Sequence, residues 1–472
     1  MTASCETERL LSCKNSQGLE IQATLLRLSR HMVVFEVYSA HVVLRMSEVL
    51  SDFRILVEDR PVYSGRAVVS NLINAGTITV CEATLEDSWV DVGLFSLLER
   101  EDGLQEGFGR FFEQWEKSYR VLPEYKVVVS DLQTFLADLR LWLEQLELEI
   151  HSSPSADRAQ LECEVVQRVG KPILASLTHF FEKSENIAEG LEEDLKPAHR
   201  AYIKRQLHPL LLASPFLYRT FQKPLGYAGD YEMVNMIVRD PLEGASLFAK
   251  IVNLWFWQQP PAEAHRNRID YLAQKLLEET VRIARQDRPT RVLNLGCGPA
   301  CEVQRFLADS ELSDRIQFTL LDFNEETLAH TRTVLNRKKQ RHGRNTAIQF
   351  VKKSVNQILK EGARTVEGSP QSKYDLVYCA GLFDYLSDQI CQRLMSILYG
   401  WVAPGGLLLA TNVHVCNPRR LTMEYVMEWN LIYRDRARMA ALQPERATTD
   451  DLLISSDATG VNVYLEVRKP NN

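Results

Sequence analysis

The 472-residue sequence lacks any uninterrupted apolar run of the ~20 residues that a membrane-spanning helix requires. Its first residues also lack the basic flank and apolar core that mark a secretory signal peptide. We therefore expect a cytoplasmic protein with no transmembrane segment. At this length, two or three domains are expected rather than one.

Positive charge is scarce, since the formal net charge at pH 7 is -7. Proteins that bind nucleic acid usually carry a basic patch or stripe, so we expect no nucleic-acid partner. The one dense basic run, Asn336–Arg344, is interpreted as a solvated helix end and loop rather than as a site for a polyanion.

Paired cysteines are also missing. The nine cysteines are an odd number, and no two of them form a Cys-x-x-Cys pair. Cys297, Cys301 and Cys379 fall in stretches that we expect to form a core. The pattern therefore predicts buried free thiols, with neither a disulfide framework nor a metal site.

The most informative stretch that is present is Arg291–Glu302. Its apolar start runs into Gly296-x-Gly298, and a second apolar run, Phe318–Asp322, ends on an acid about one βα unit later. This is the pattern of a βαβ unit with a nucleotide-binding turn. Glycines let the backbone approach a ligand closely, and Asp322 is placed to accept hydrogen bonds from both hydroxyls of a ribose.

The third glycine of the dinucleotide fingerprint is absent, because Cys301 stands in its place. NAD is therefore disfavoured. The run Leu295–Ala300 instead resembles motif I of the class I S-adenosylmethionine methyltransferases, and Asp322 matches their ribose-binding acid. The resemblance implies S-adenosyl-L-methionine as the cofactor. Asn294 stands where many of those enzymes carry Asp or Glu.

Apolar strand-like runs alternate with helical segments through the rest of residues 259–472, which predicts a doubly wound sheet. Ligands of such sheets sit at the carboxyl ends of the strands. By resemblance to the methyltransferases, the expected cofactor-binding residues at those ends are Gly296, Cys297, Gly298, Asp322, Phe323, Asn324, Ser354, Val355, Ala380 and Gly381.

Within residues 1–98, the stretch from Gly18 to about Asp91 reads as short strands with period-two alternation, which predicts a small antiparallel barrel. The stretch resembles a PilZ domain, a module that binds cyclic di-GMP in other proteins. Of that family's ligand motifs only Ser29 and Arg9 find counterparts here. We expect a degenerate barrel used for packing or for a homodimer, the alternative being a second-messenger sensor.

Residues 99–258 show helical periodicity, interrupted by a linker at His151–Asp157. The exception is Phe221–Asn235, where two glycines and a proline within seven residues exclude a helix interior. This loop also gathers two tyrosines, an Asp and a Glu. We interpret it as a lid over a ligand rather than as a surface turn.

A more specific resemblance rests on Lys223–Met233, the motif I glycines and Ala380–Leu386. Together they resemble the bacterial synthases of 3-hydroxypalmitic acid methyl ester, a quorum-sensing signal, from about Leu161 to the end. The whole chain is then α/β: a Rossmann-like methyltransferase domain preceded by a helical linker and lid region and by the PilZ-like barrel.

The resemblance implies carboxyl O-methylation of a long-chain 3-hydroxy fatty acid, free or on a carrier protein. A fatty-acid carboxylate is ionised at neutral pH, so the enzyme supplies mainly approach and alignment. The alternatives are methylation of a hydroxyl or amine with a general base, and a nucleotide-sensing regulator without catalysis.

The expected positioning groups for the reaction are Tyr227, Tyr231, Arg266 and Tyr385. On a helical wheel His265 and Arg266 continue the apolar face of the helix that starts at Pro260, whereas Arg268 points to its edge. The expected substrate-binding residues are Asp230, His265, Asp384, Met427 and Tyr433. The stretch Arg419–Arg434 is read either as the wall of an acyl tunnel or as plain core.

Overall fold

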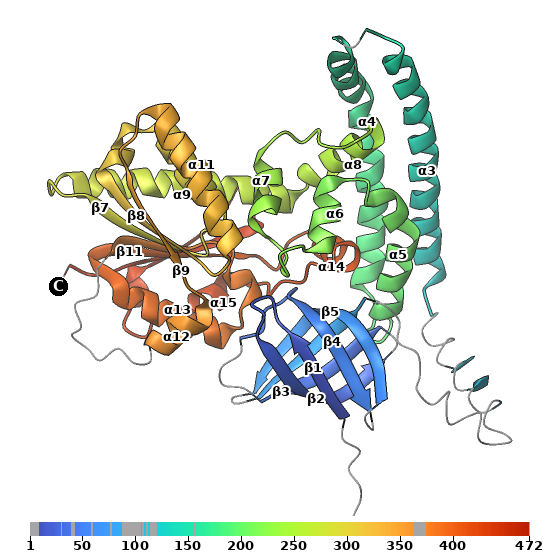
Figure 1. The fold of residues 1–472 in the computed structure, drawn as a ribbon, viewed down its shortest axis with the longest axis horizontal. Helices are drawn as coiled ribbons and strands as arrows, with labels where there is room; N and C mark the ends of the chain where they lie inside the picture. Colours follow the sequence, from blue (N-terminus) through green and yellow to red (C-terminus); the bar gives the residue numbers. More distant parts are fainter. Residues whose placement is uncertain are drawn as a thin grey trace, which may run out of the picture.

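The computed structural model describes residues 9–29, 31–38, 43–57, 60–75, 78–86, 105, 108–109, 112–113, 120–154, 156–362 and 374–471. Figure 1 shows a β-barrel, a bundle of helices and an α/β sheet, with the barrel packed against the other two near the place where they meet. The expected fold class, a Rossmann-like sheet preceded by helices and a barrel, is confirmed.

The barrel is closed and antiparallel, with strand order β1-β2-β3-β6-β5-β4. Alternation places one side of each strand in its core, as in β2, where Ile21, Ala23 and Leu25 are buried. β1 was not predicted. The strands are β1 (Arg9–Lys14), β2 (Glu20–Ser29), β3 (Met32–Val37), β4 (Val49–Val57), β5 (Arg60–Ala75) and β6 (Ile78–Leu85).

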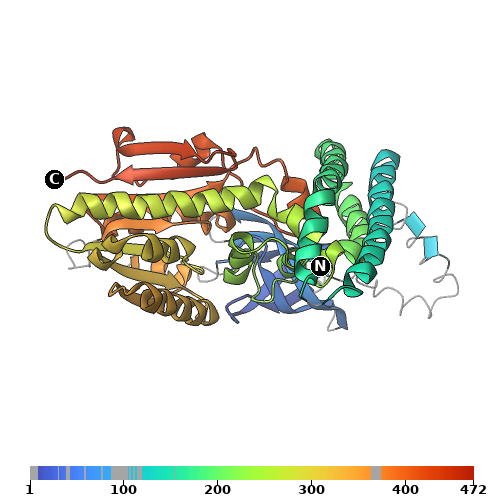
Figure 2. The same cartoon turned by 90° about the horizontal axis from the view of Figure 1, so that it is seen from above.

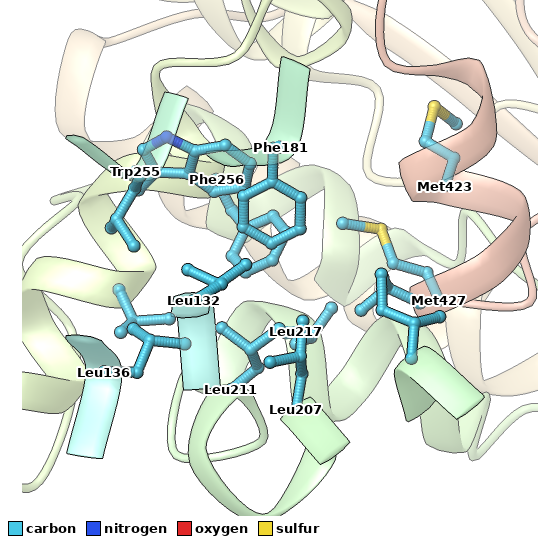
Figure 3. Close-up of a cluster of buried hydrophobic side chains, with 14 of the residues drawn as sticks. Leu132, Leu136, Phe181, Leu207, Leu211, Leu217, Trp255, Phe256, Met423 and Met427 are labelled. Atoms are coloured by element: carbon cyan, nitrogen blue, oxygen red, sulfur yellow. The ribbon is translucent and has the colours of Figure 1, made fainter. Parts of the chain in front are cut away.

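The helical region is built on two long helices that pack side by side, α3 (Pro123–His151) and α4 (Arg158–Glu189), joined at the predicted linker. Their apolar faces meet shorter helices around Leu132, Phe181 and Trp255 (Figure 3). Those helices are α5 (Lys196–Leu211), α6 (Pro215–Gln222), α7 (Tyr231–Val238) and α8 (Leu247–Trp257).

A seven-stranded sheet of order β12-β13-β11-β10-β7-β8-β9 forms the last part. Its central strands are parallel, and β13 runs antiparallel to both its neighbours. The strands are β7 (Thr290–Leu295), β8 (Ile316–Asp322), β9 (Ala347–Lys352), β10 (Tyr374–Cys379), β11 (Val402–Val413), β12 (Leu452–Ser456) and β13 (Asn462–Arg468). β12 was not predicted.

Helices cover both faces of this sheet. α9 (Pro260–Ala284) packs on β7, β10 and β13 and extends toward the helical region (Figure 2). α10 and α11 share its face, and α12 and α13 cover the other. The remaining bounds are α10 (Cys301–Asp309), α11 (Glu325–His342), α12 (Val355–Gly362), α13 (Asp388–Trp401), α14 (Arg420–Val426) and α15 (Arg436–Ala440), with short 3-10 turns at Glu311–Arg315, Phe383–Tyr385 and Thr449–Asp451.

The barrel is fastened to the other two parts by the segment between β3 and β4. Met46 N donates to Tyr385 O at 3.2 Å, and Val49 N donates to Gly226 O at 2.8 Å. Ser47 Oγ donates to Asn430 O at 2.9 Å. The barrel therefore reaches the carboxyl edge of the sheet. Among the described helices, none is both long enough and apolar enough to span a membrane.

Candidate active site

A cavity, called the central pocket below, lies where the carboxyl ends of β7, β8 and β10 meet the barrel and the helical region. It holds about 1780 Å³ of space not filled by atoms, part of which is open to solvent. Each part of the chain lines it: Arg45 and Met46 belong to the barrel segment, Trp255 to the helices and Gly296 to the sheet.

The floor of the central pocket is the glycine turn after β7. Gly296 and Gly298 have φ angles of +71° and +50°, a region that L side chains rarely adopt. Gly296 N donates to Leu321 O at 2.9 Å, which ties the turn to β8. A Cβ added to Gly298 would meet no atom within 4 Å, so this backbone faces open space that a ligand can fill.

Asp322 lies at the end of β8 and is only 6% exposed. Its carboxylate accepts from Gly298 N at 3.2 Å and from Asn324 N at 3.0 Å, so it fixes both turns that border the pocket. Burial raises the pKa of this carboxyl group. A carboxylate in this position can accept further hydrogen bonds from the hydroxyls of a ribose.

Most of the residues predicted to bind the cofactor line the central pocket: Gly296, Cys297, Gly298, Asp322, Phe323, Val355, Ala380 and Gly381. Asn324 and Ser354 do not, and their predicted contact is corrected. Asn324 Oδ1 accepts from Thr327 N at 2.9 Å as the cap of α11. Ser354 Oγ accepts from Gln357 N at 3.3 Å in the first turn of α12. Both side chains satisfy helix N-termini instead of facing a ligand.

Tyr227 and Tyr385 line the pocket from opposite elements, the Phe221–Asn235 loop and the turn after β10. The Tyr385 hydroxyl accepts from Trp429 Nε1 at 2.9 Å, which leaves its own proton to donate. Burial is the main cause that raises the pKa of both tyrosines. Both hydroxyls therefore act as hydrogen-bond donors, not as bases, at neutral pH.

Tyr231 lines the pocket through its ring, whereas its hydroxyl donates to Glu326 Oε1 at 2.9 Å. Burial and that contact raise the pKa of Tyr231 to about 12. Asp230 does not line the pocket, so its predicted contact with substrate is wrong. Its carboxylate caps α7 by accepting from Met233 N at 2.9 Å, and it pairs with Arg219 at 2.9 Å.

The helical-wheel prediction for α9 was wrong about its two arginines, although His265 and the predicted apolar face do lie toward the pocket. Arg266 stacks on Trp257, 3.7 Å from the ring centroid, and donates to Trp257 O at 3.0 Å, outside the central pocket. Arg268 is the arginine that lines the pocket, at 6% exposed. The buried face of α9 includes Glu279 and is centred near Leu272, so it is rotated toward Arg268.

Among the predicted substrate-binding residues, His265, Asp384 and Met427 line the pocket. Asp384 Oδ1 accepts from Val413 N at 2.7 Å, and burial raises the pKa of this carboxyl to about 6. Tyr433 does not line the pocket. Its ring is buried under the Arg420 guanidinium, 4.8 Å from the centroid, which corrects the prediction.

Three residues that line the pocket were not predicted from the sequence: Arg45, Glu302 and Arg268. All three are buried. The Arg45 guanidinium lies 4.3 Å from the Phe323 ring centroid, close to Asp322. Nothing in a barrel sequence indicates contact with a strand end far along the chain. Glu302 carried a usable signal, because it is an acid between buried residues in the first turn after the glycines.

These residues fit S-adenosylmethionine. The open space over Gly298 can receive the cofactor, and Asp322 can receive its ribose. Asn294 lines the pocket, and its buried Oδ1 has no hydrogen-bond partner among the described residues, as expected beside a site for a polar ligand group. When bound, the cofactor supplies an activated methyl group.

Residues 293–408, from β7 to β11, match a family described as a methyltransferase domain. No curated protein matches the chain. Similar solved structures include a possible exported protein from Bordetella parapertussis, with 17% identity, TM-score 0.40, and coverage of 65% of this chain and 98% of that one. Magnesium protoporphyrin IX methyltransferase from Synechocystis with bound SAH has 9% identity, TM-score 0.34, and coverage of 57% and 99%. An O-methyltransferase family protein from Burkholderia thailandensis has 14% identity, TM-score 0.33, and coverage of 70% and 98%.

Structural likenesses this weak carry no argument about substrate. The family match and the glycine turn agree, because the matched residues contain Gly296, Gly298 and Asp322. The chain therefore contains a class I methyltransferase domain and is an S-adenosylmethionine-dependent methyltransferase.

Proposed function

We propose that the protein methylates the carboxylate of a long-chain 3-hydroxy fatty acid, free or carried on another protein, and so makes its methyl ester. The observation that carries this proposal is the apolar arm of the central pocket. From the glycine turn the pocket extends into the helical region, where Gln259, Arg419 and Thr422 are polar but most of the lining is apolar: Phe216, Met233, Val234, Ile237, Trp255, Phe256, Ala262, Met423 and Met427.

The walls of this arm suit a flexible alkyl chain. Trp255 stacks on Phe181 with ring centroids 4.3 Å apart, which makes one rigid side, and Met423 and Met427 lie across from it (Figure 3). Methionine side chains adapt to irregular apolar ligands. Each CH₂ group buried in such an arm contributes about 0.8 kcal/mol, so chain length would strongly affect affinity.

The polar end of the pocket suits a carboxylate. Tyr227 and Tyr385 hold hydroxyl protons there, and neither residue needs to remove a proton from an already ionised substrate. Alignment of the carboxylate with the methyl group can contribute roughly 7 to 11 kcal/mol toward lowering the barrier. The loop that carries Tyr227 is also the stretch that resembles the quorum-signal synthases, which supports the same substrate and a signalling role for the product.

Incubation of the purified protein with deuteromethyl-labelled S-adenosylmethionine and 3-hydroxy fatty acids of graded length tests the proposal. We expect mass spectrometry to find a labelled methyl ester that forms fastest with a long chain. The same acids supplied as acyl-carrier-protein thioesters test the carrier-bound form. Labelled esters from short and long acids at equal rates would contradict the role of the apolar arm.

A second candidate function is methylation of a hydroxyl or amine, with Asp384 as general base. The observation in its favour is that burial raises the pKa of this pocket carboxyl to about 6. Here the rate should fall as the pH drops through 6, because the base becomes protonated. A carboxylate substrate stays ionised to about pH 5, so its rate should hold over that range. The pH profile therefore separates the two functions.

A further inference from the structure

Two buried residues of opposite charge, Arg268 and Glu302, line the central pocket, and neither forms an ion pair within 4.0 Å with another described residue. Arg268 is 6% exposed, and in the part of the chain that the structure describes no Asp or Glu oxygen lies within 4.0 Å of its guanidinium. Its Nη2 donates to the His265 ring, 2.6 Å from Nε2. A neutral imidazole accepts a hydrogen bond but does not neutralise a buried cation. Asp384, also in the pocket, acts on Arg268 only from beyond ion-pair distance and accepts from Val413 N, so Arg268 has no anion in direct contact among the described residues.

Glu302 is the matching acid. It is 6% exposed, and its Oε1 accepts from Asn294 Nδ2 at 3.0 Å and from the Tyr378 hydroxyl at 2.7 Å. Both donors are neutral. No Lys or Arg nitrogen of the described residues lies within 4.0 Å of the Glu302 carboxylate. Arg268 acts on it only from a distance.

Asn294 adds an orphaned acceptor beside Glu302. The side chain is 2% exposed, its amide nitrogen is committed to Glu302, and its Oδ1 has no partner within the described residues. All three residues line the pocket next to the glycine turn. A ligand that satisfies the set must present a carboxylate to Arg268 and a cationic N–H donor to Glu302 and Asn294.

An α-amino acid is a group of that kind, and the cofactor carries one at the end of its methionine part. We propose that Arg268 binds the methionine carboxylate of S-adenosylmethionine and that Glu302, with Asn294, binds its ammonium group. The acid that many related enzymes place at the end of the first strand, where this chain has Asn294, is here supplied by Glu302 in the first turn of α10. Asn294 keeps a contact through its amide oxygen.

Gly381 supports this placement. Its φ is +87°, and a Cβ there would lie 3.2 Å from Arg268 Nη2. The guanidinium therefore packs directly on the turn after β10, which borders the cofactor floor. A side chain at position 381 would displace the guanidinium, so the position of Arg268 depends on glycine at 381.

Calorimetry with charge-deleted analogues tests the proposal. The ligands are S-adenosylhomocysteine, 5′-(3-aminopropylthio)adenosine, which lacks the carboxylate, and 5′-(3-carboxypropylthio)adenosine, which lacks the amine. Arg268→Met should weaken S-adenosylhomocysteine binding about 10- to 100-fold, the range for a lost charge-assisted hydrogen bond, and leave the aminopropyl analogue unchanged. Glu302→Gln should weaken S-adenosylhomocysteine and the aminopropyl analogue and leave the carboxypropyl analogue unchanged.

Arg266→Met is the matched control, because this arginine lies two positions away on α9 and outside the pocket. It should bind all three ligands as the unmodified protein does. If Arg268→Met does not fold, Arg268→Lys keeps the charge but cannot make two parallel hydrogen bonds to a carboxylate. It should still weaken binding of S-adenosylhomocysteine more than binding of the aminopropyl analogue. Equal loss for both ligands, or unchanged S-adenosylhomocysteine affinity with a raised KM for the acyl substrate, would overturn the assignment.

Discussion

Replacing Gly298 with alanine asks whether the cofactor lies directly on the backbone of the glycine turn. At a φ of +50° an L side chain is strained by about 1–2 kcal/mol. The new methyl group would meet no protein atom within 4 Å, so it would project into the open space of the pocket. We expect the free energy of unfolding to fall by about 1 kcal/mol and the affinity for S-adenosylhomocysteine to fall at least about tenfold, the effect of losing one hydrogen bond as the ligand shifts.

Gly343→Ala is the control that separates strain from contact. Gly343 has a φ of +65° at the C-terminal end of α11, and a Cβ there also meets nothing within 4 Å. It lies outside the central pocket. Urea unfolding should give both variants a similar loss of stability, while calorimetry should show weaker binding for Gly298→Ala alone. Equal and unimpaired binding by both variants would refute a cofactor seated on this turn.

Three further substitutions address the rest of the site. Asp322→Asn removes the charge expected to hold the ribose, so we expect S-adenosylhomocysteine affinity to fall about 10- to 100-fold, and an unchanged affinity would remove that assignment. Tyr227→Phe should lower kcat about tenfold while the Kd for S-adenosylhomocysteine stays the same. Steady-state kinetics and calorimetry measure the two, and an unchanged kcat with a weaker Kd would contradict the positioning role. Arg45→Met should weaken S-adenosylhomocysteine binding a few-fold, because the guanidinium braces the ring beside Asp322 with a contact of about 0.5–2 kcal/mol, whereas Arg54→Met on the exposed side of β4 should not.

A pH prediction follows from Asp384. Burial raises its pKa from 3.8 to about 6, so its contribution to stability is full below the unfolded pKa and is lost as the pH rises through 6. Asp384→Asn should remove this loss. Its stability advantage over the unmodified protein should therefore grow between pH 5 and pH 7 by about 1 kcal/mol in urea unfolding. A stability difference independent of pH would show that this carboxyl does not titrate in that range.

The parts of the fold that the sequence predicted are those encoded locally. The glycine turn, the acid after β8 and the alternation of strands and helices each depend on residues within one βαβ unit. Helix caps are equally local, yet the predicted ligand contacts Asp230, Asn324 and Ser354 prove to be such caps. A polar residue directly before a helix, with a backbone donor two or three positions on, is first of all a cap.

The features that could not be predicted from the sequence are those that depend on which surfaces pack together in the folded protein. The apolar residues of α9 alone predict one buried face, but the face that packs on the sheet and the pocket also contains Arg268 and Glu279. Charged residues on a buried face cannot be recognised before their partners are known. For the same reason, a loop such as the one that carries Arg45 gives no indication of the distant strand end on which it packs.

The barrel is then better understood as a wall of the active site than as a separate module. Its contacts with the turn after β10 and with the Phe221–Asn235 loop include backbone hydrogen bonds made by Met46 N and Val49 N, and Arg66 Nη1 also donates to Gln222 O. Both partners, Tyr385 and Gly226, belong to segments that also carry pocket residues. A shift of the barrel would therefore move the tyrosine turn and the loop together, and would withdraw Arg45 from the ring beside Asp322. The position of the barrel and the shape of the pocket are therefore coupled: a change in one is expected to change the other.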